Sequence, residues 1–336
     1  MAVQTIGDLA QGLILRRQSN VLKQQVETLS QELSSGLTSD VTQHLSGNLV
    51  QLADVEHKLQ VLESYRTSAQ RGGTESGVMQ TALERIQTET EALAGSALTF
   101  GTSVGAAGID VFAQEARGAL GALVSALNTH VGGRALFAGA NVTDLPLAST
   151  EDFIAALGTA VSGAATMADL TTAMDVFFDT PGGGFETLIY QGGIAPRAAY
   201  PLGEGESVTL DLRADDPSIR TVLKQVAISA VLDDPGITLS ETDRFALAGQ
   251  AGEALLGAQT RFTDIRADLG FAEERIDRAA SRLSAEISGL NMMRTELLAV
   301  DPFETATELE TVQLRLETLY TITARTSRLS LVNFLS

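Results

Sequence analysis

The stretch that decides the fold is residues 262–300, FTDIRADLGFAEERIDRAASRLSAEISGLNMMRTELLAV. Its apolar residues recur at intervals of seven, in the series Phe262, Leu269, Ile276, Leu283, Leu290 and Leu297. The interleaved series is Ile265, Ala272, Ala279, Glu286, Met293 and Val300, with one polar fault at Glu286. This heptad repeat predicts a coiled-coil helix. Since the pattern extends upstream to residue 241, we expect one helix of roughly 60 residues and about 90 Å.

The long helix is predicted to end at Asp301-Pro302-Phe303-Glu304. Asp can cap a helix, Pro suits the first helical position, and Glu can complete a capping box, so a second helix starts here. One face of this helix is formed by Ala306, Leu309, Val312, Leu316, Leu319 and Thr323.

The N-terminal end carries a matching stripe. Its first part is Leu22, Val26, Leu29, Leu33 and Gly36, and after a polar break at 34–40 it resumes through Leu45, Leu49, Leu52, Val55, Leu59, Leu62 and Ala69. A helix cannot bury its own stripe, so the first and last segments of the chain are expected to pack together.

The middle of the chain has a different composition. Two further helices are expected at 78–98 and 109–136, and the segment 140–236 then holds most of the prolines. Within that segment we expect helices at 151–178 and 217–232 and short strands at 186–190 and 207–212.

The predicted fold is therefore mainly α. A long antiparallel coiled-coil or bundle rod is formed by both chain ends, and an α+β outer domain is inserted into it. The predicted domains are terminal assembly helices (1–40 with 302–336), a helical rod (41–139 with 237–301) and the inserted outer domain (140–236).

Composition excludes several classes of function. A formal charge of −19 argues against nucleic acid as a partner, because phosphate binding needs clustered Lys and Arg. No apolar run approaches the ~18 residues that span a bilayer, so membrane insertion is not expected. The first residues lack the pattern of a cleaved signal peptide. The chain is predicted to be cytoplasmic or exported by a route that needs no such signal.

Catalytic and cofactor motifs are not found. His44, His57 and His130 stand far apart without neighbours at metal-ligand spacing, and the chain has no Cys. The Gly-rich run at 180–185 lacks the Lys-Ser/Thr of a phosphate loop, and no G-x-S-x-G elbow occurs. We therefore expect no catalytic residue, no cofactor and no metal.

Motifs at both ends resemble those of the bacterial flagellin family. Residues 29–36, LSQELSSG, are similar to its L-x-x-x-L-S-S-G element, and residues 133–139, GRALFAG, to its G-x-x-L-F-x-G element. Residues 190–193, YQGG, resemble its Y-x-G-D element, with Gly193 in place of the acid. The stretch 297–335 resembles the family's C-terminus, and its ending, 330–335 SLVNFL, is most like hook-associated protein 3, which joins hook to filament.

This resemblance implies a structural subunit of the bacterial flagellum at the hook-filament junction. It implies secretion through the flagellar type III export channel, an extracellular location, and an export chaperone at the C-terminal helix. The implied partners are further copies in a ring, a neighbouring hook-associated protein on the hook side and flagellin on the filament side. A filament flagellin is the alternative within the family. A coiled-coil signalling or scaffold protein with a ligand-binding insert is the alternative from another class, and a hydrolase ranks behind it.

Assembly by a flagellar subunit would couple folding to contact with neighbours. Without neighbours, residues 1–40 and 302–336 are expected to be disordered or weakly helical, because ordering must be offset by apolar burial. The predicted assembly interface is Leu22, Val26, Leu29, Leu33, Leu316, Leu319, Leu331 and Phe334. The predicted intrachain seam is Leu52, Leu59, Leu62, Phe262, Leu269, Ile276, Leu283, Leu290 and Leu297.

Overall fold

The fold is described from a computed structural model of the chain. It describes the backbone of residues 6–103 and 107–335, and the side chains of residues 10, 12–99 and 108–325. The fold is mainly α, as predicted, and it divides into two compact units. The first unit is Met1–Glu63 with Ala285–Ser336, and the second unit is Ser64–Ser284.

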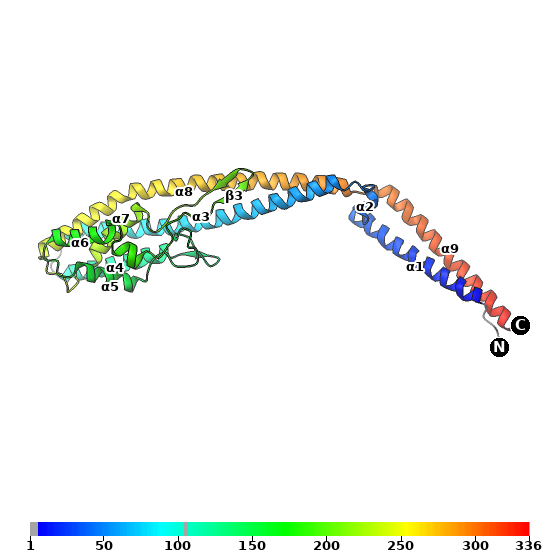
Figure 1. The fold of residues 1–336 in the computed structure, drawn as a ribbon, viewed down its shortest axis with the longest axis horizontal. Coiled ribbons are helices and arrows are strands. Elements are labelled where there is room, and N and C mark those ends of the chain that lie inside the picture. The colour runs from blue at the N-terminus through cyan, green and yellow to red at the C-terminus, as the bar shows by residue number, and fades with distance from the viewer. Residues whose placement is uncertain (1–5, 104–106, 336) are drawn as a thin grey trace. The chain divides into compact units, whose positions relative to one another are not determined.

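The first unit is built on a pair of helices from the two ends of the chain. Its elements are α1 (Ile6–Ser35), α2 (Val41–His44), α9 (Pro302–Leu335), the first turns of α3 (Val50–Ser103) and the last turns of α8 (Glu241–Leu298). α1 packs along α9 (Figure 1). The side chains of α1 that are half-buried recur every three or four residues, as the predicted stripe requires.

A short backbone ladder fixes the ends of the helices in this unit. Gly36 ends α1 in a left-handed conformation (φ 71°), which a residue without Cβ adopts at little cost. The N–H of Thr38 then donates to the carbonyl of Leu298 (2.9 Å), and the N–H of Val300 donates to the carbonyl of Gly36 (3.1 Å). α9 starts as the sequence predicts, because an Asp301 carboxylate oxygen accepts from the N–H of Phe303 (2.8 Å).

The prediction that Glu286 occupies a position of the heptad seam is wrong. Glu286 is exposed, and the next residue, Ile287, is buried against Val55 and Leu59. An α-helix has 3.6 residues per turn, so it drifts by about 20° per heptad from a strict repeat of seven. Over the three heptads from Ile265 to Glu286 the drift is about 60°, which carries Glu286 off the buried face. Ile287, four residues after the buried Leu283, lies on that face instead.

The second unit holds the remaining parts of α3 and α8, packed side by side. The Gln80 side-chain amide donates to the Arg266 carbonyl (2.9 Å), and the Gln259 amide donates to the Thr90 hydroxyl (3.1 Å). α3 is continuous through Gly72 and Gly73, so the expectation of a separate helix beginning at residue 78 is wrong. α4 (Ala107–Leu127) packs on α7 (Pro217–Ala230).

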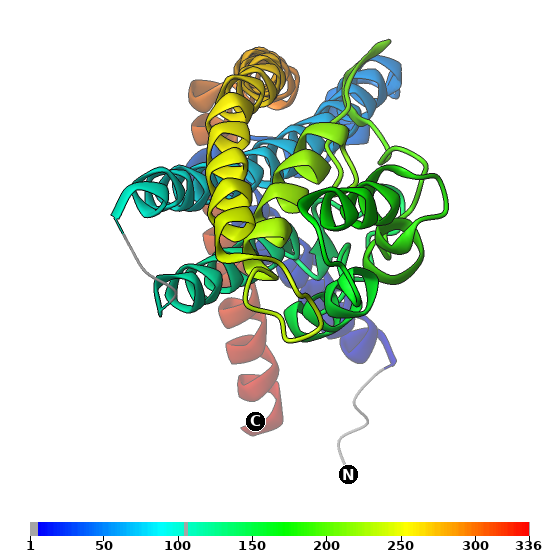
Figure 2. The same ribbon diagram turned by 90° about the vertical axis from the view of Figure 1, so that its left-hand side faces the viewer.

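The rest of the second unit is a set of short elements around a phenylalanine core. They are β1 (His130–Val131), β2 (Arg134–Ala135), α5 (Thr150–Val161), α6 (Met167–Asp179), the π-helical turn η1 (Phe185–Ile189), β3 (Tyr200–Gly203) and β4 (Glu206–Val208). β1 pairs with β2, and β3 with β4, both antiparallel. Phe153, Phe178 and Phe185 are fully buried with ring centroids 5.5–6.4 Å apart. Figure 2 shows α5 and α6 (green) grouped with α7 (yellow-green).

Four local predictions in this region are wrong. The strand expected at 207–212 is limited to β4, which ends at Val208. The helix expected at 151–178 is two helices, because the chain turns at Gly163 (φ 85°) between α5 and α6. The strand expected at 186–190 is η1, whose Phe185 and Ile189 point together into the core. The helix expected to reach residue 136 stops at Leu127, and Gly132 and Gly133 (φ 58° and 75°) form the β1–β2 hairpin turn.

Candidate assembly surface

The three histidines lie on the surface and do not meet. His44 is on α2, His57 on α3 and His130 on β1, and all three are exposed. In the described part of the chain, no group of three or more His, Asp or Glu side chains is placed to hold a metal ion. No helix among the described residues has both the length and the apolar character to cross a bilayer.

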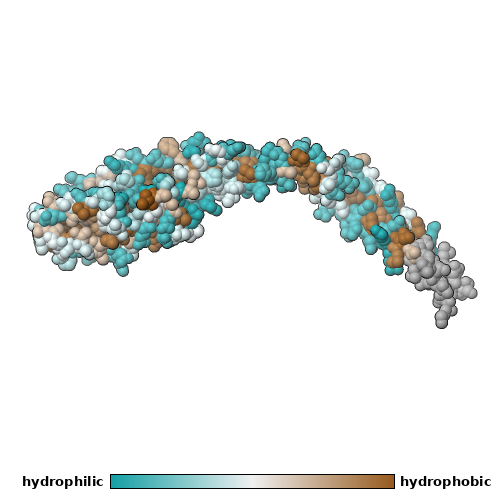
Figure 3. Space-filling model, in the orientation of Figure 1, coloured by the Kyte–Doolittle hydropathy of each residue, from teal (hydrophilic) through white to brown (hydrophobic). Residues whose placement is uncertain are grey.

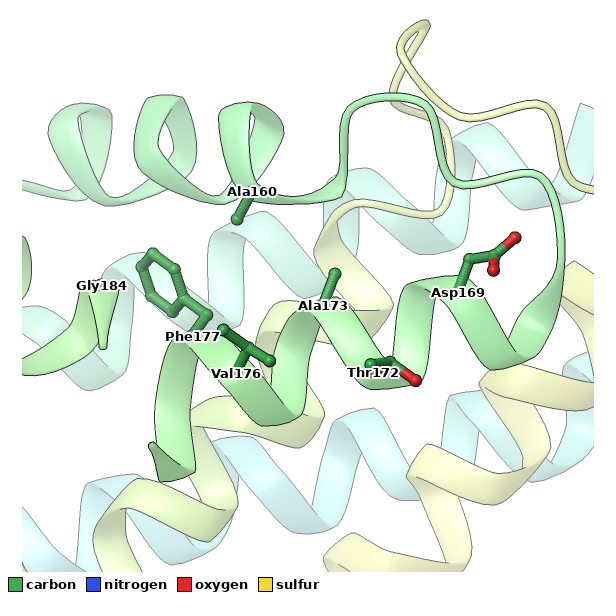
Figure 4. A pocket seen from close by; sticks show the side chains of 7 residues that line it. All are labelled: Ala160, Asp169, Thr172, Ala173, Val176, Phe177 and Gly184. Atoms are coloured by element: carbon green, nitrogen blue, oxygen red, sulfur yellow. The ribbon is translucent and has the colours of Figure 1, made fainter. Parts of the chain in front are cut away.

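A shallow pocket of about 470 Å³ lies over α6 in the second unit (Figure 4). It is lined mainly by Ala160, Ala173, Val176 and Phe177, with the Asp169 carboxylate at one end. That carboxylate accepts the N–H of Thr166 (2.9 Å) in a capping box, and the Thr166 hydrogen bonds lower the pKa of Asp169. The acid therefore serves the start of α6, and the pocket lacks the convergent polar groups that a ligand-binding insert requires.

The predicted assembly residues lie mostly along the line where α1 faces α9. Leu22, Val26 and Leu29 are half-buried on α1; Leu316 is half-buried and Leu319 is 9% exposed on α9. Leu33 is exposed, and Leu331 and Phe334 are outside the described side chains. Their assignment to contacts between subunits stays a prediction.

The residues of the predicted intrachain seam are buried or partly buried, and their assignment as a seam stays a prediction. In the first unit Leu52 and Leu59 are buried, while Leu62, Leu290 and Leu297 are partly buried against the cluster of Val55, Leu59 and Ile287. In the second unit Phe262, Leu269, Ile276 and Leu283 are all buried.

A groove of about 680 Å³ runs along the outside of the α1/α9 pair. Its apolar lining includes two predicted assembly residues, Leu22 and Leu319. The rest of that lining is 47–65% exposed and consists of Ile14 and Val21 on α1 and Leu314 and Ile322 on α9. Arg17, Arg315, Gln18 and Thr318 supply its polar atoms. Figure 3 shows hydrophobic side chains (brown) gathered on this pair of helices, next to the undescribed residues in grey. We call this set of residues the terminal groove.

A second hollow, of about 470 Å³, lies on the same pair near the start of α9. Phe303 stands in its lining with 83% of its surface exposed, beside Gln25, Thr307 and Val312.

Only Leu22 and Leu319 of the terminal groove were predicted, because the sequence pattern was read only for the stripe that joins α1 to α9. The signal was present: Ile14 and Val21 are seven residues apart, and Leu314 and Ile322 eight, so each pair lies on one helix face. A second apolar stripe beside the first is expected of a helix that packs against two other helices.

Two of the resemblance motifs meet in the second unit. The N–H of Gly193 donates to the carbonyl of Ala138 (2.8 Å), and the N–H of Ala140 donates to the carbonyl of Ala195 (2.9 Å). Gly139 (φ 59°) lies between them, and a Cβ there would be 2.6 Å and 2.7 Å from the carbonyl oxygens of Gly193 and Ala195. The glycine that ends the first motif is therefore required by its contact with the second.

Comparison with known proteins finds similarity to flagellar proteins in the C-terminal sequence and in the fold. A family model of the bacterial flagellin C-terminal helical region matches residues 253–335. The fold is similar to that of a putative flagellar hook-associated protein from Vibrio parahaemolyticus, with a TM-score of 0.54 and 13% identity over 74% of this chain and 96% of that one. No curated protein matches the chain.

The chain is a mainly helical protein whose first and last helices pack together. More specifically, it is flagellin-like, since residues 253–335 match the C-terminal helical region of the bacterial flagellin family. Bacterial flagellin is a structural and non-enzymatic family.

Proposed function

We propose that this protein is a hook-associated subunit that joins the hook to the filament, and that it assembles through its terminal helices. The observation that carries the proposal is the terminal groove on the α1/α9 pair, where half-exposed apolar side chains follow one another on two helices. A helix pair with a second apolar face is suited to packing in a ring or tube of like subunits.

The energy available from covering this groove is substantial. Ile14, Val21, Leu314 and Ile322 are each about half exposed, and full burial of such a side chain stabilises by about 1.5–3 kcal/mol. Covering the remaining half of all four would contribute about 3–6 kcal/mol per subunit, before the cost of association. In this proposal, the free energy gained by covering the groove offsets the entropy cost of ordering residues 1–40 and 302–336 on assembly.

The charge distribution supports contacts through the ends of the chain. Residues 140–236 carry 14 acidic and four basic residues, a formal charge of −10, and their copies in adjacent subunits would repel one another. Residues 1–40 and 302–336 each carry four acidic and three basic residues, a formal charge of −1. The nearly neutral ends are therefore the segments that can approach their copies closely.

The junction role is preferred over that of a filament flagellin for two reasons. The structural neighbour is named a putative hook-associated protein, and the ending 330–335, SLVNFL, is of the junction type. In this role the subunit is secreted by flagellar type III export with a chaperone on its C-terminal helix. It then contacts a hook-associated protein on one side, flagellin on the other, and its own copies around the ring.

Deletion of the gene, followed by electron microscopy and analysis of the culture medium, tests the junction role. We expect hooks without filaments, with flagellin released into the medium. Normal filaments on the deletion strain would refute the proposal. Bare hooks without flagellin in the medium would also refute it, and would indicate that the chain is itself the filament flagellin.

The terminal groove is tested by complementing this strain with Leu314→Asp. Gln313→Asp is the matched control, because Gln313 is exposed on the same helix, outside the groove lining, and its substitution adds the same charge. We expect secretion of both variants but filaments only with the control. Equal filament numbers in the two strains would show that assembly does not use this groove.

A further inference from the structure

The β3–β4 hairpin lies against both α3 and α8 in the second unit (Figure 1). Tyr200, at the start of β3, is buried over Gly72 of α3. A Cβ on Gly72 would be 3.3 Å from the Tyr200 ring and 3.2 Å from the Cδ1 atom of Ile276 on α8. Gly72 is thus the point where the hairpin and both helices meet.

A buried ion pair attaches this region to α3. The guanidinium of Arg197, just before β3, pairs with the Glu75 carboxylate, and both side chains are 2% exposed. The Tyr200 hydroxyl also donates to Glu75, and Arg197 Nη1 donates to the Leu136 carbonyl (3.3 Å). Burying a charged pair in this way costs desolvation, and its best-attested use is to fix one register of packing.

Two arginines attach the hairpin to α8. Arg282 Nη2 donates to the carbonyl of Leu202 (3.2 Å) and to the Glu206 carboxylate (2.7 Å). Arg275 Nη2 donates to the carbonyl of Ser207 (3.0 Å). The hairpin is therefore held by charged side chains at both helices.

The segment of α3 under the hairpin is intrinsically poor at forming a helix. It contains Gly72, Gly73 and Gly77, and glycine is the least favourable residue in a helix interior after proline. The sequence predicts a break here, yet the helix continues without interruption. Something outside α3 must hold this segment helical.

We propose that the β3–β4 hairpin is a clasp that holds α3 against α8 and keeps α3 helical through Gly72, Gly73 and Gly77. When the clasp is released, residues 66–80 of α3 open locally while the phenylalanine core stays folded. The segment is a built-in weak point whose order depends on the hairpin.

Hydrogen exchange of the full-length chain, followed by mass spectrometry, tests the clasp. The variant is Arg275→Gln with Arg282→Gln, because removing Arg197 would leave Glu75 buried without its partner and threaten folding. The matched control is Arg278→Gln, on the same helix, where Arg278 pairs only with Glu274 one turn away and is exposed. Circular dichroism confirms that both variants are folded.

In the double variant we expect exchange about tenfold faster over residues 66–80, because the hydrogen bonds that hold the hairpin to α8 are lost and the hairpin no longer covers this segment. Exchange in α5 and α6, and everywhere in the control, should change less than about twofold. Adding Gly77→Ala should slow exchange of the segment again, because no atom lies within 4 Å of a Cβ there and alanine favours the helix. Unchanged exchange over 66–80, or equal acceleration throughout the unit, would overturn the proposal.

Discussion

Alanine at Gly139 is expected to destabilise the second unit far more than alanine at Gly133. Both glycines have a left-handed backbone (φ 59° and 75°), so both substitutions introduce the same kind of conformational strain. They differ in their surroundings: a Cβ at Gly133 meets no atom within 4 Å, whereas at Gly139 it meets two carbonyl oxygens.

The two costs can be worked out separately. A left-handed conformation costs an L-residue about 1–2 kcal/mol, partly offset by about 0.4–1 kcal/mol from the reduced freedom of the unfolded chain. Gly133→Ala should therefore cost about 1 kcal/mol or less. At Gly139 the oxygens at 2.6 Å and 2.7 Å must also move. Their movement strains or breaks the Gly193–Ala138 and Ala140–Ala195 hydrogen bonds, which contribute about 1 kcal/mol each.

The expected cost of Gly139→Ala is therefore about 3–4 kcal/mol, and the difference from Gly133→Ala about 2–3 kcal/mol. Urea unfolding of both variants and the wild type, monitored by circular dichroism, measures this difference. Equal midpoints for the two variants would refute the argument that the two motifs are locked together at Gly139.

Three further outcomes are expected. Limited proteolysis of the free subunit should remove residues 1–40 and 302–336 before cutting elsewhere; resistance of both ends would contradict ordering on assembly. Self-association, measured by sedimentation, should strengthen with added salt, because salt screens the repulsion between the −10 segments at 140–236; weaker association in salt would place the contacts on ion pairs instead. Finally, burial and the hydrogen bond to Glu75 raise the pKa of Tyr200 to about 12, against about 10 in an unfolded chain. The unfolded state thus loses its proton first, so the free energy of unfolding should fall between pH 10 and 12, and less so in Tyr200→Phe.

The long helices could be predicted from the sequence because their signals are local and repeated. The series from Phe262 to Leu297 predicted α8, and Asp301-Pro302 predicted the start of α9. The errors in the seam, at Glu286 and at Met293 (45% exposed), came from treating the repeat as seven over too many turns. Because many positions of the repeat predict the same helix, an error at a few of them does not change the prediction.

The short elements could not be predicted in this way because their conformation depends on distant contacts. Residues 186–190 have strand-like composition, but Phe185 and Ile189 are four residues apart and share the phenylalanine core as a helical turn. Gly72 and Gly73 suggest a break in α3, yet Tyr200 and Ile276 pack over this point from other parts of the chain. In both cases tertiary packing overrides the local preference.

The sequence predicted an assembly surface on the terminal helices but not most of the residues that line the groove. The reason is that one apolar stripe identifies only one face of a helix. An apolar stripe shows that a helix has a partner, but a helix in a tube has several partners, and each requires its own stripe. Leu22 and Leu319 form the more buried floor of the terminal groove, while Val21 and Leu314, one and five residues away, are its more exposed lining. A single periodic series therefore finds the most buried face first, which is the face already covered within the chain. The face that remains for neighbouring subunits carries the weaker, second apolar series. This series can be recognised only once the first is known to pack within the chain.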